Sequence, residues 1–75
     1  MKILFFASVA ELTGCTDTTI NGVHTTEELK IILNRKFPGL DRLSYVVAVN
    51  KSLVTGKMNL VESDEVALLP PFSGG

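Results

Sequence analysis

The sequence predicts one α+β domain in which a mixed sheet of four or five strands packs on one main helix. A chain of 75 residues can build a single compact core, but not two lobes with a cleft between them. Two unbroken apolar runs, at 3–7 and 45–50, have the composition of buried strands. Between them, residues 25–36 repeat apolar side chains with the period of an α-helix. One amphipathic helix can cover one face of a sheet, which determines the fold class.

The first part of the chain is predicted to form a strand, a short helix and a second strand. Residues 3–7 are apolar β-formers without a polar interruption, which favours a central strand covered on both faces. Ser8 and Glu11 have the spacing of a capping box, and Gly14 can close a short helix in the left-handed conformation. The Thr-rich stretch 16–22 favours an exposed strand that ends in an Asn-Gly turn and pairs with the first strand.

The main helix is predicted to begin after Thr25 and to end near residue 36. Thr25 and Glu28 form a capping-box pair at its start. Pro38 and Gly39 end it, because the residue before a proline avoids helical geometry. One face carries apolar side chains at a spacing of three and four residues: Leu29, Ile32, Leu33 and Phe37.

The remaining chain is predicted to add three strands. Residues 45–50 form the second apolar run, and residues 52–55 return antiparallel to it after a tight turn. A polar turn at 61–64 leads to the last strand at 65–70, which a proline stops because it cannot donate a ladder hydrogen bond. This order of elements predicts a sheet curled around one helix, which is the β-grasp arrangement of ubiquitin.

Charge and composition argue against several classes of function. Seven Lys and Arg against eight Asp and Glu give a formal net charge of -1 without a basic run, so we expect no nucleic-acid partner. The apolar stretch at the start is too short to span a bilayer, so we expect a strand there and no membrane association. Cys15 is a single cysteine, which excludes an intrachain disulfide and a thiolate zinc cluster. We therefore expect a cytoplasmic chain that binds no metal and no cofactor of its own.

Side chains inside the domain form no catalytic constellation. His24 has no orienting carboxylate or nucleophile in a motif around it, so we interpret it as a surface turn residue and not as a general base. Cys15 lacks a second cysteine or a flanking cation, which favours an incidental thiol over a sulfur relay. Asp64 and Glu65 would point to opposite faces of a strand, and we interpret them as solvated residues of a turn.

The six residues after the last predicted core position indicate a functional tail. We divide the chain into a domain at 1–69 and an extended, flexible tail at 70–75. Two prolines follow the strand and fix the direction in which the tail leaves the domain. Residues 72–75 can extend at most about 13–14 Å, which is enough to enter a pocket of another protein. The two final glycines carry no side chain, so a narrow channel could admit the backbone.

The carboxylate of Gly75 is then the chemically useful group. It is ionised at pH 7, with an ordinary pKa of about 3.3–3.7, and in that state it is a poor acyl donor. Joining it to AMP creates a leaving group that a sulfur or nitrogen nucleophile can displace. A frayed end is the usual interpretation of a terminal Ser-Gly-Gly, but the prolines and the paired glycines favour a reactive terminus.

Three segments resemble one protein family in their order and spacing. They are LFFASVAELTG at the start, AVNKSLV in the middle and DEVALLPPFSGG at the end, so the similarity runs along the whole chain. They are similar to the small subunit of molybdopterin synthase, a ubiquitin-like sulfur carrier with a β-grasp fold. The resemblance implies that Gly75 is adenylated and converted to a thiocarboxylate. This group would donate sulfur to the molybdopterin dithiolene in molybdenum cofactor biosynthesis.

The resemblance also implies the partners. A ubiquitin-activating-like enzyme uses ATP to adenylate the tail, and a persulfide-bearing protein supplies the sulfur. The tail enters the large subunit of molybdopterin synthase, in a heterotetramer of two small and two large chains, and the small chain has no catalytic pocket of its own. We expect the residues near the tail to bind these partners: Phe6, Leu69, Pro70, Pro71, Phe72, Ser73 and Gly74. For Phe6 and Leu69, packing in the core is the alternative interpretation.

Small departures from the family pattern concern the choice of partner. Leu68 and Leu69 stand where aromatic residues are often found, and Phe72 replaces a smaller aliphatic residue. Ser63 stands where a glycine often precedes the last strand. These changes affect interface packing and one turn, and they leave the chemistry of the tail unchanged.

Three other functions remain open at this point. The sulfur carrier of thiamin thiazole synthesis shares the fold, the terminal glycines and the activation, but it is usually shorter and lacks a counterpart of FFASVAELTG. A ubiquitin-like protein modifier could use the same acyl adenylate to form an isopeptide bond with a lysine. A noncatalytic binding module would have an inert tail.

Overall fold

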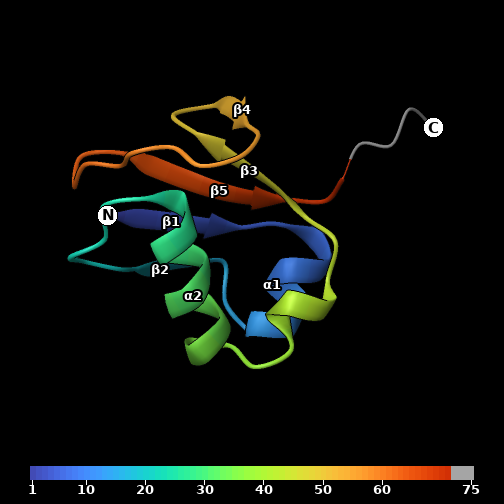
Figure 1. Cartoon of the computed structure of the whole chain (residues 1–75). Coiled ribbons are helices and arrows are strands. Elements are labelled where there is room, and N and C mark those ends of the chain that lie inside the picture. Colours follow the sequence, from blue (N-terminus) through green and yellow to red (C-terminus); the bar gives the residue numbers. More distant parts are fainter. Residues whose placement is uncertain (72–75) are drawn as a thin grey trace.

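The computed structural model describes residues 1–71 and shows a five-stranded mixed sheet with two α-helices and one 3-10 helix (Figure 1). Residues 72–75 lie outside the described part of the chain. In chain order the elements are β1 (Lys2–Phe5), α1 (Ala7–Thr13), β2 (Asp17–Thr19), α2 (Thr26–Lys36), η1 (Leu40–Arg42), β3 (Val46–Val49), β4 (Ser52–Val54) and β5 (Glu65–Leu69).

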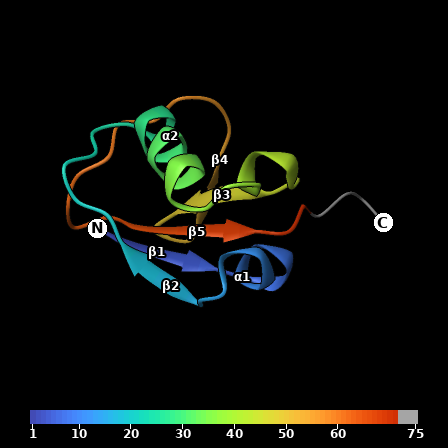
Figure 2. The ribbon, with the colours of Figure 1, turned by 90° about the horizontal axis from the view of Figure 1, so that it is seen from below.

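The sheet has the strand order β2-β1-β5-β3-β4. β1 and β5 pair in parallel, and the other neighbouring strands pair antiparallel. The parallel register places Lys2 beside Glu65 and Phe5 beside Leu68, so the carboxyl ends of β1 and β5 lie at the same end of the sheet. α2 crosses one face of this sheet (Figures 1 and 2). The predicted β-grasp arrangement is confirmed, with five strands.

The main helix, α2, begins and ends where the sequence predicts. The Thr25 hydroxyl accepts a hydrogen bond from the backbone N–H of Glu28 (3.2 Å), and the Glu28 carboxylate accepts one from the N–H of His24 (2.9 Å). Both bonds satisfy backbone donors at the start of the helix. At the other end, the N–H of Phe37 donates to the carbonyl of Leu33 (2.8 Å), and the following proline stops the helix.

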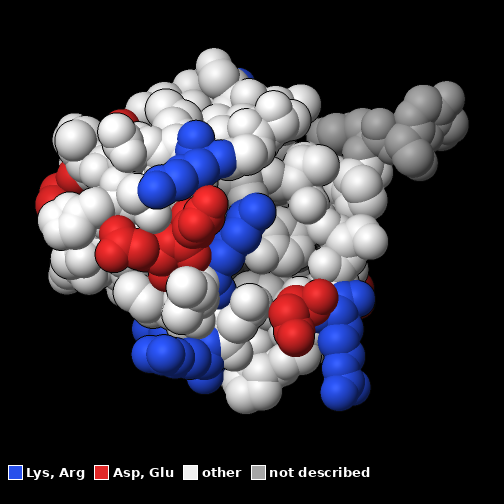
Figure 3. Space-filling model, in the orientation of Figure 1, with Lys and Arg blue, Asp and Glu red and all other residues white. Residues whose placement is uncertain are grey.

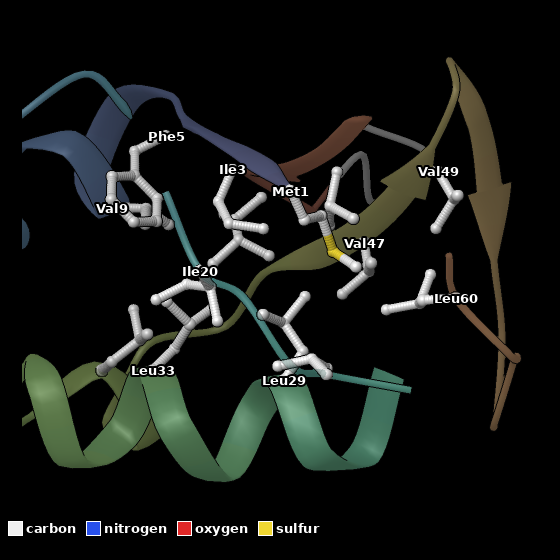
Figure 4. Close-up of a cluster of buried hydrophobic side chains, with 14 residues drawn as sticks. Met1, Ile3, Phe5, Val9, Ile20, Leu29, Leu33, Val47, Val49 and Leu60 are labelled. Atoms are coloured by element: carbon white, nitrogen blue, oxygen red, sulfur yellow. The ribbon is translucent and has the colours of Figure 1, made fainter. Parts of the chain in front are cut away.

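An apolar core fills the space between α2 and the sheet (Figure 4). Phe5 on β1 and Phe37 after α2 meet edge to face, with ring centroids 5.4 Å apart. Burying one large apolar side chain contributes about 1.5–3 kcal/mol to the free energy of unfolding. The buried side chains between α2 and the sheet therefore hold the helix in place. The core consists of Met1, Ile3, Phe5, Val9, Ile20, Val23, Leu29, Leu33, Leu40, Val47, Val49, Leu60, Val66 and Leu68.

The short helix α1 starts differently from the prediction. The predicted capping box at Ser8 and Glu11 is wrong, because Phe6 is the N-cap residue and its side chain makes no capping hydrogen bond. Ala7 takes a left-handed φ of 51°, which turns the chain sharply out of β1. The end of the helix is as predicted, since Gly14 has a φ of 74° and its N–H bonds to a carbonyl of the last turn (2.9 Å).

The first strand lies inside the sheet, as predicted, but the prediction that it is covered on both faces is wrong. β1 lies between β2 and β5, one strand from the edge of the sheet. Ile3 and Phe5 are buried in the core, but Leu4 is only half-buried and Phe6 is 43% exposed. The helices of the described chain all lie on the core side of the sheet, so none covers the second face (Figures 1 and 2). The apolar run therefore contributes to two surfaces, one inside the core and one that faces outward.

The connection between β4 and β5 is held against the start of α2 by one buried threonine. Thr26 is 2% exposed. Its N–H donates to the carbonyl of Met58 (2.9 Å), and its hydroxyl accepts the N–H of Met58 (3.0 Å) and donates to the carbonyl of Gly56 (3.4 Å). Next to it, Thr25 forms an isolated bridge with Asn59. These bonds order a connection that contains no strand of its own.

We expect Thr26→Val to lower the free energy of unfolding by about 1–2 kcal/mol, because the variant keeps the shape but leaves the N–H of Met58 without its acceptor. Urea denaturation followed by circular dichroism measures this change. Thr19→Val, at an exposed position of β2, is the matched control and should change the free energy by less than about 0.5 kcal/mol. Equal losses in the two variants would show that the Thr26 hydroxyl does not stabilise the connection.

Candidate functional site

The tail leaves the domain at the end of β5. Leu69, the last residue of the strand, is half-buried, as is Pro70, and Pro71 is exposed. Because β1 runs parallel to β5, Phe6 lies at the same end of the sheet, where its N–H donates to the carbonyl of Leu68 (3.2 Å). The other predicted tail residues lie outside the described part of the chain, and their roles stay predictions: Phe72, Ser73, Gly74 and Gly75.

An apolar groove lies on the face of the sheet opposite α2, and we call it the open-face groove. Strand alternation creates it, because Val66 and Leu68 of β5 point into the core while Ala67 and Leu69 point to the other face. Its volume is about 450 Å³, which is within the range of binding pockets. The groove is lined by Leu4, Phe6, Ala48, Lys51, Leu53, Glu65, Ala67 and Leu69.

The cross-section of the groove follows from one row of residues across four strands. Leu4 pairs in register with Ala67, Ala67 with Ala48, and Ala48 with Leu53. Two small side chains thus form the floor, and two large ones form the walls. Leu53 is 63% exposed, so one wall stands free in solvent. Exposed apolar side chains gathered around a hollow are typical of a surface that binds another protein or a ligand.

The two ends of the groove differ in polarity. Phe6 and Leu69 form an apolar end beside the exit of the tail. Lys51 and Glu65 line the other end, where Lys2 on β1 is the neighbour of Glu65 in register. A strand rises about 3.3 Å per residue, so the charged end lies about 13 Å from the apolar end along β5. The two ends of the groove are therefore chemically different, and a partner could distinguish them.

The charged end is built on a two-residue turn with an unusual backbone. Asn50 and Lys51 join β3 to β4 with φ values of 50° and 71°. This is the left-handed pair of a type I′ hairpin turn, in which the second residue is usually glycine. The N–H of Glu65 donates to the side-chain oxygen of Asn50 (3.0 Å), and the N–H of Asn50 donates to the carbonyl of Glu65 (2.8 Å). These bonds fasten the turn to β5 and hold Lys51 at the groove.

Asp64 fastens the same turn from the loop that precedes β5. Its carboxylate accepts the N–H of Val61 (2.9 Å) and the side-chain amide of Asn50 (2.8 Å). These bonds, the backbone one first, hold the pKa of Asp64 below its ordinary value of 3.8. Asp64 thus lies in the predicted turn, and its carboxylate also stabilises the neighbouring hairpin.

The other candidate residues lie apart from the groove. His24 is exposed, and Cys15 packs half-buried against the core with a free thiol. Within residues 1–71, no three His, Cys, Asp or Glu side chains gather as metal ligands. No helix in that range combines the length and the apolar character needed to cross a membrane. On the face drawn in Figure 3, acidic and basic side chains are interspersed and form no patch of one sign.

Sequence reasoning found the two apolar residues at the tail exit but missed most of the groove. The floor, Ala48 and Ala67, and the free wall, Leu53, were not singled out. Alternation within each strand could have indicated which residues share a face. The row itself depends on the register between strands that are far apart in sequence, and no local signal specifies that register.

The pH dependence of stability tests the role of Asp64. Because its folded-state pKa is depressed, its contribution is fully present above the ordinary value of 3.8 and is lost as the pH falls through the folded-state pKa. We expect the stability difference between the parent and Asp64→Asn to be constant above about pH 5 and to shrink below about pH 4. Urea denaturation across this range measures it, with Asp41→Asn on η1 as the control for charge removal. A difference that does not change with pH would contradict the assignment.

The turn predicts a substitution that stabilises the protein. A left-handed conformation costs an L-residue about 1–2 kcal/mol, and glycine avoids this cost while losing about 0.5–1 kcal/mol through its greater freedom in the unfolded chain. We therefore expect Lys51→Gly to raise the free energy of unfolding by up to about 1 kcal/mol. Thermal unfolding measures the change, and Lys57→Gly in the β4–β5 connection is the control. A loss of stability in Lys51→Gly would show that the lysine side chain supports the fold.

Comparison with known proteins gives the family. The model of the ThiS family matches residues 3–75. The molybdopterin synthase sulfur carrier subunit of Arabidopsis thaliana is 38% identical to this chain over all of its residues and 82% of the relative's length. The match therefore includes the strands, the groove and the terminal glycines.

Solved structures share the ubiquitin-like β-grasp fold. Small archaeal modifier protein 1 from Methanosarcina acetivorans has a TM-score of 0.78 at 22% identity, with 99% of this chain and 94% of that chain covered. At that identity the likeness concerns the fold. A complex of subunits 1 and 2 of the molybdopterin-converting factor from Helicobacter pylori contains a chain with a TM-score of 0.71 at 25% identity, with 99% of this chain and 96% of that chain covered. On the strength of the family match and the full-length relative, the chain belongs to the ThiS family.

Proposed function

We propose that this chain is the sulfur carrier subunit of molybdopterin synthase and acts as the sulfur donor of that sulfurtransferase. The observation that carries the proposal is the full-length similarity to a relative of that name, 38% identical over all of this chain. The family match extends to residue 75, so the matched region includes the terminal Ser-Gly-Gly of this chain. The reactive group is therefore the carboxylate of Gly75.

Activation makes this carboxylate an acyl donor. Its oxygen attacks the α-phosphate of ATP on a ubiquitin-activating-like enzyme, pyrophosphate leaves, and an acyl adenylate forms. A sulfur nucleophile mobilised from a persulfide-bearing protein attacks the acyl carbon, and AMP leaves. This attack joins the acyl carbon to the terminal sulfur of the carrier's persulfide, and a thiol then reduces the S–S bond, so that the carrier ends in a disulfide with that thiol and a thiocarboxylate remains on Gly75. This sulfur is then transferred to the pterin precursor to build the dithiolene.

The fold supports delivery of the tail into a partner. β5 ends at the tail exit, two prolines follow, and the open-face groove begins at the same end with Phe6 and Leu69. A protein that covers the groove is thereby placed beside the tail. The final glycines carry no side chains, so the backbone can pass through a narrow channel. The groove supplies recognition, and the tail supplies the reacting group.

The partner that fits is the large subunit of molybdopterin synthase, in an assembly of two small and two large chains. The fold neighbour from Helicobacter pylori is a complex of two subunits of the molybdopterin-converting factor, which supports a partner of this kind. The reaction pocket belongs to that partner. It should present Lys or Arg to the tail, because an unpaired carboxylate is costly to bury.

The competing functions have less support. A thiamin-type sulfur carrier would share the family, but the full-length relative described above carries the molybdopterin synthase name. A protein modifier could use the same adenylate. The modifier from Methanosarcina acetivorans is 22% identical, and that likeness bears on the fold alone. An inert tail would leave without a role a segment that lies inside the family match.

The test is intact mass spectrometry of the parent chain after incubation with the activating enzyme, ATP and a sulfur source. We expect a mass gain equal to the exchange of one oxygen for one sulfur, because the acyl adenylate is open to attack by sulfur. No such gain would contradict the proposal. A conjugate to lysine in place of the thiocarboxylate would identify a modifier instead.

Deletion of Gly75 provides the matched control. This variant should show no sulfur gain and no sulfur transfer, while its melting temperature stays within about 1 °C of the parent, because ends outside a core contribute little to stability. The buried core of the described residues ends at Leu68, which supports this expectation. Unfolding of the shortened chain would show that the tail stabilises the domain.

A further inference from the structure

We propose that Lys51 is a specificity-determining residue of the docking face. It recognises a carboxylate on the large subunit of molybdopterin synthase and fixes the direction in which that subunit lies along the open-face groove. The inference rests on the proposed function, and it names the chemistry that the partner must bring to this site. The argument uses the backbone of the turn, the charges around it and the shape of the groove.

The backbone of Lys51 is the first observation. Its φ of 71° lies in the left-handed region, at a turn position that glycine occupies without strain. Within residues 1–71, the Lys51 ammonium forms no ion pair and no hydrogen bond that would offset this strain. Strained residues persist where the surrounding structure holds them, and they gather at binding sites. A lysine held in this way at the rim of a groove is placed for a group on another molecule.

The surrounding charges are the second observation. Glu65 lines the same end of the groove, and its register neighbour on β1 is Lys2; within residues 1–71 its carboxylate forms no ion pair with Lys51. The Asp64 carboxylate is engaged by Asn50 and by the backbone of Val61. Lys51 therefore adds a positive charge that the neighbouring acids do not take up. A carboxylate is the complementary group.

The shape of the groove is the third observation. The apolar row and the apolar end favour contact with a partner but do not determine which way round the partner lies, because hydrophobic contact depends on the area buried and not on orientation. A charged pair at one end adds the direction, since complementary charges fix the register of an interface. The charged end lies about 13 Å along β5 from the tail exit. A partner docked the wrong way round would place its carboxylate at Phe6 and Leu69 and would hold its channel away from the tail.

The occupant we infer is the large subunit and not a second copy of this chain. The groove is continuous with the tail exit at Leu69. The protein that covers the groove is therefore the one that receives the tail.

The experiment measures binding of the cognate large subunit to the parent chain and to three variants with the tail intact. Lys51→Glu reverses the charge, and Lys51→Gly removes it while relaxing the turn. Lys30→Glu is the charge-matched control, because Lys30 is an exposed residue of α2, which lies across the opposite face of the sheet. Fluorescence anisotropy gives Kd and the association rate at low and at high salt, and thermal unfolding confirms that each variant is folded.

We expect Lys51→Glu to weaken binding at least tenfold and to slow association, with the difference from the parent narrowing at high salt because rim charges are screened. Lys51→Gly should bind three- to tenfold more weakly although it is at least as stable as the parent. Weaker binding by a variant that is no less stable would show that the Lys51 side chain acts in recognition of the partner and not in folding. Lys30→Glu should stay within twofold of the parent.

Three outcomes would overturn the inference. Equal binding by Lys51→Glu and Lys30→Glu would show that only net charge matters, and the proposed function would be unaffected. Normal binding of Lys51→Glu to the large subunit, together with impaired adenylation, would place the carboxylate on the activating enzyme. Failure of the parent itself to bind the large subunit would overturn both this inference and the proposed function.

Discussion

The parallel pairing of β1 with β5 is the constraint on which the rest of the structure depends. It joins the first strand of the domain to the last, with Lys2 beside Glu65 and Phe5 beside Leu68. Closing such a long loop is costly in entropy, and the buried core between the sheet and α2 offsets that cost. The pairing brings the carboxyl ends of both strands to one end of the sheet, so the tail leaves beside Phe6.

The one-sided cover of the sheet is the second determinant of function. α2 and its core occupy one face, while the other face keeps a row of two alanines between two leucines. The helices of the described chain form one layer on the core side of the sheet, so no helix covers the second face. An apolar surface for a partner is therefore available on a face that does not contribute to the core. In the function that we propose, the open-face groove selects the partner, and the carboxylate of Gly75 reacts inside that partner.

The elements whose bounds were predicted correctly are those that residues close in sequence determine. α2 begins at the Thr25 cap and ends before Pro38, because capping and proline geometry act within one helical turn. The predictions were wrong where contacts between residues distant in sequence determine the local structure. Phe6, not Ser8, caps α1, because pairing with β5 extends to Phe6 and the chain turns at Ala7. The run at 3–7 suggested burial on both faces, since apolar composition does not distinguish a core surface from a binding surface.

The sequence by itself determined the fold class, the boundaries of the main helix and the hairpin between β3 and β4, and it is the basis of the chemistry that we propose for the terminal glycine. These follow from local periodicity, capping and turn residues, and from the likeness of three segments to one family. The tertiary structure alone decided that Leu4, Ala67, Ala48 and Leu53 form one row and that Lys51 stands at its charged end. The physical reason is register: it is set largely by pairing between strands that are distant in sequence, and a shift of one residue in any of these strands would turn its side chains to the other face and break the row.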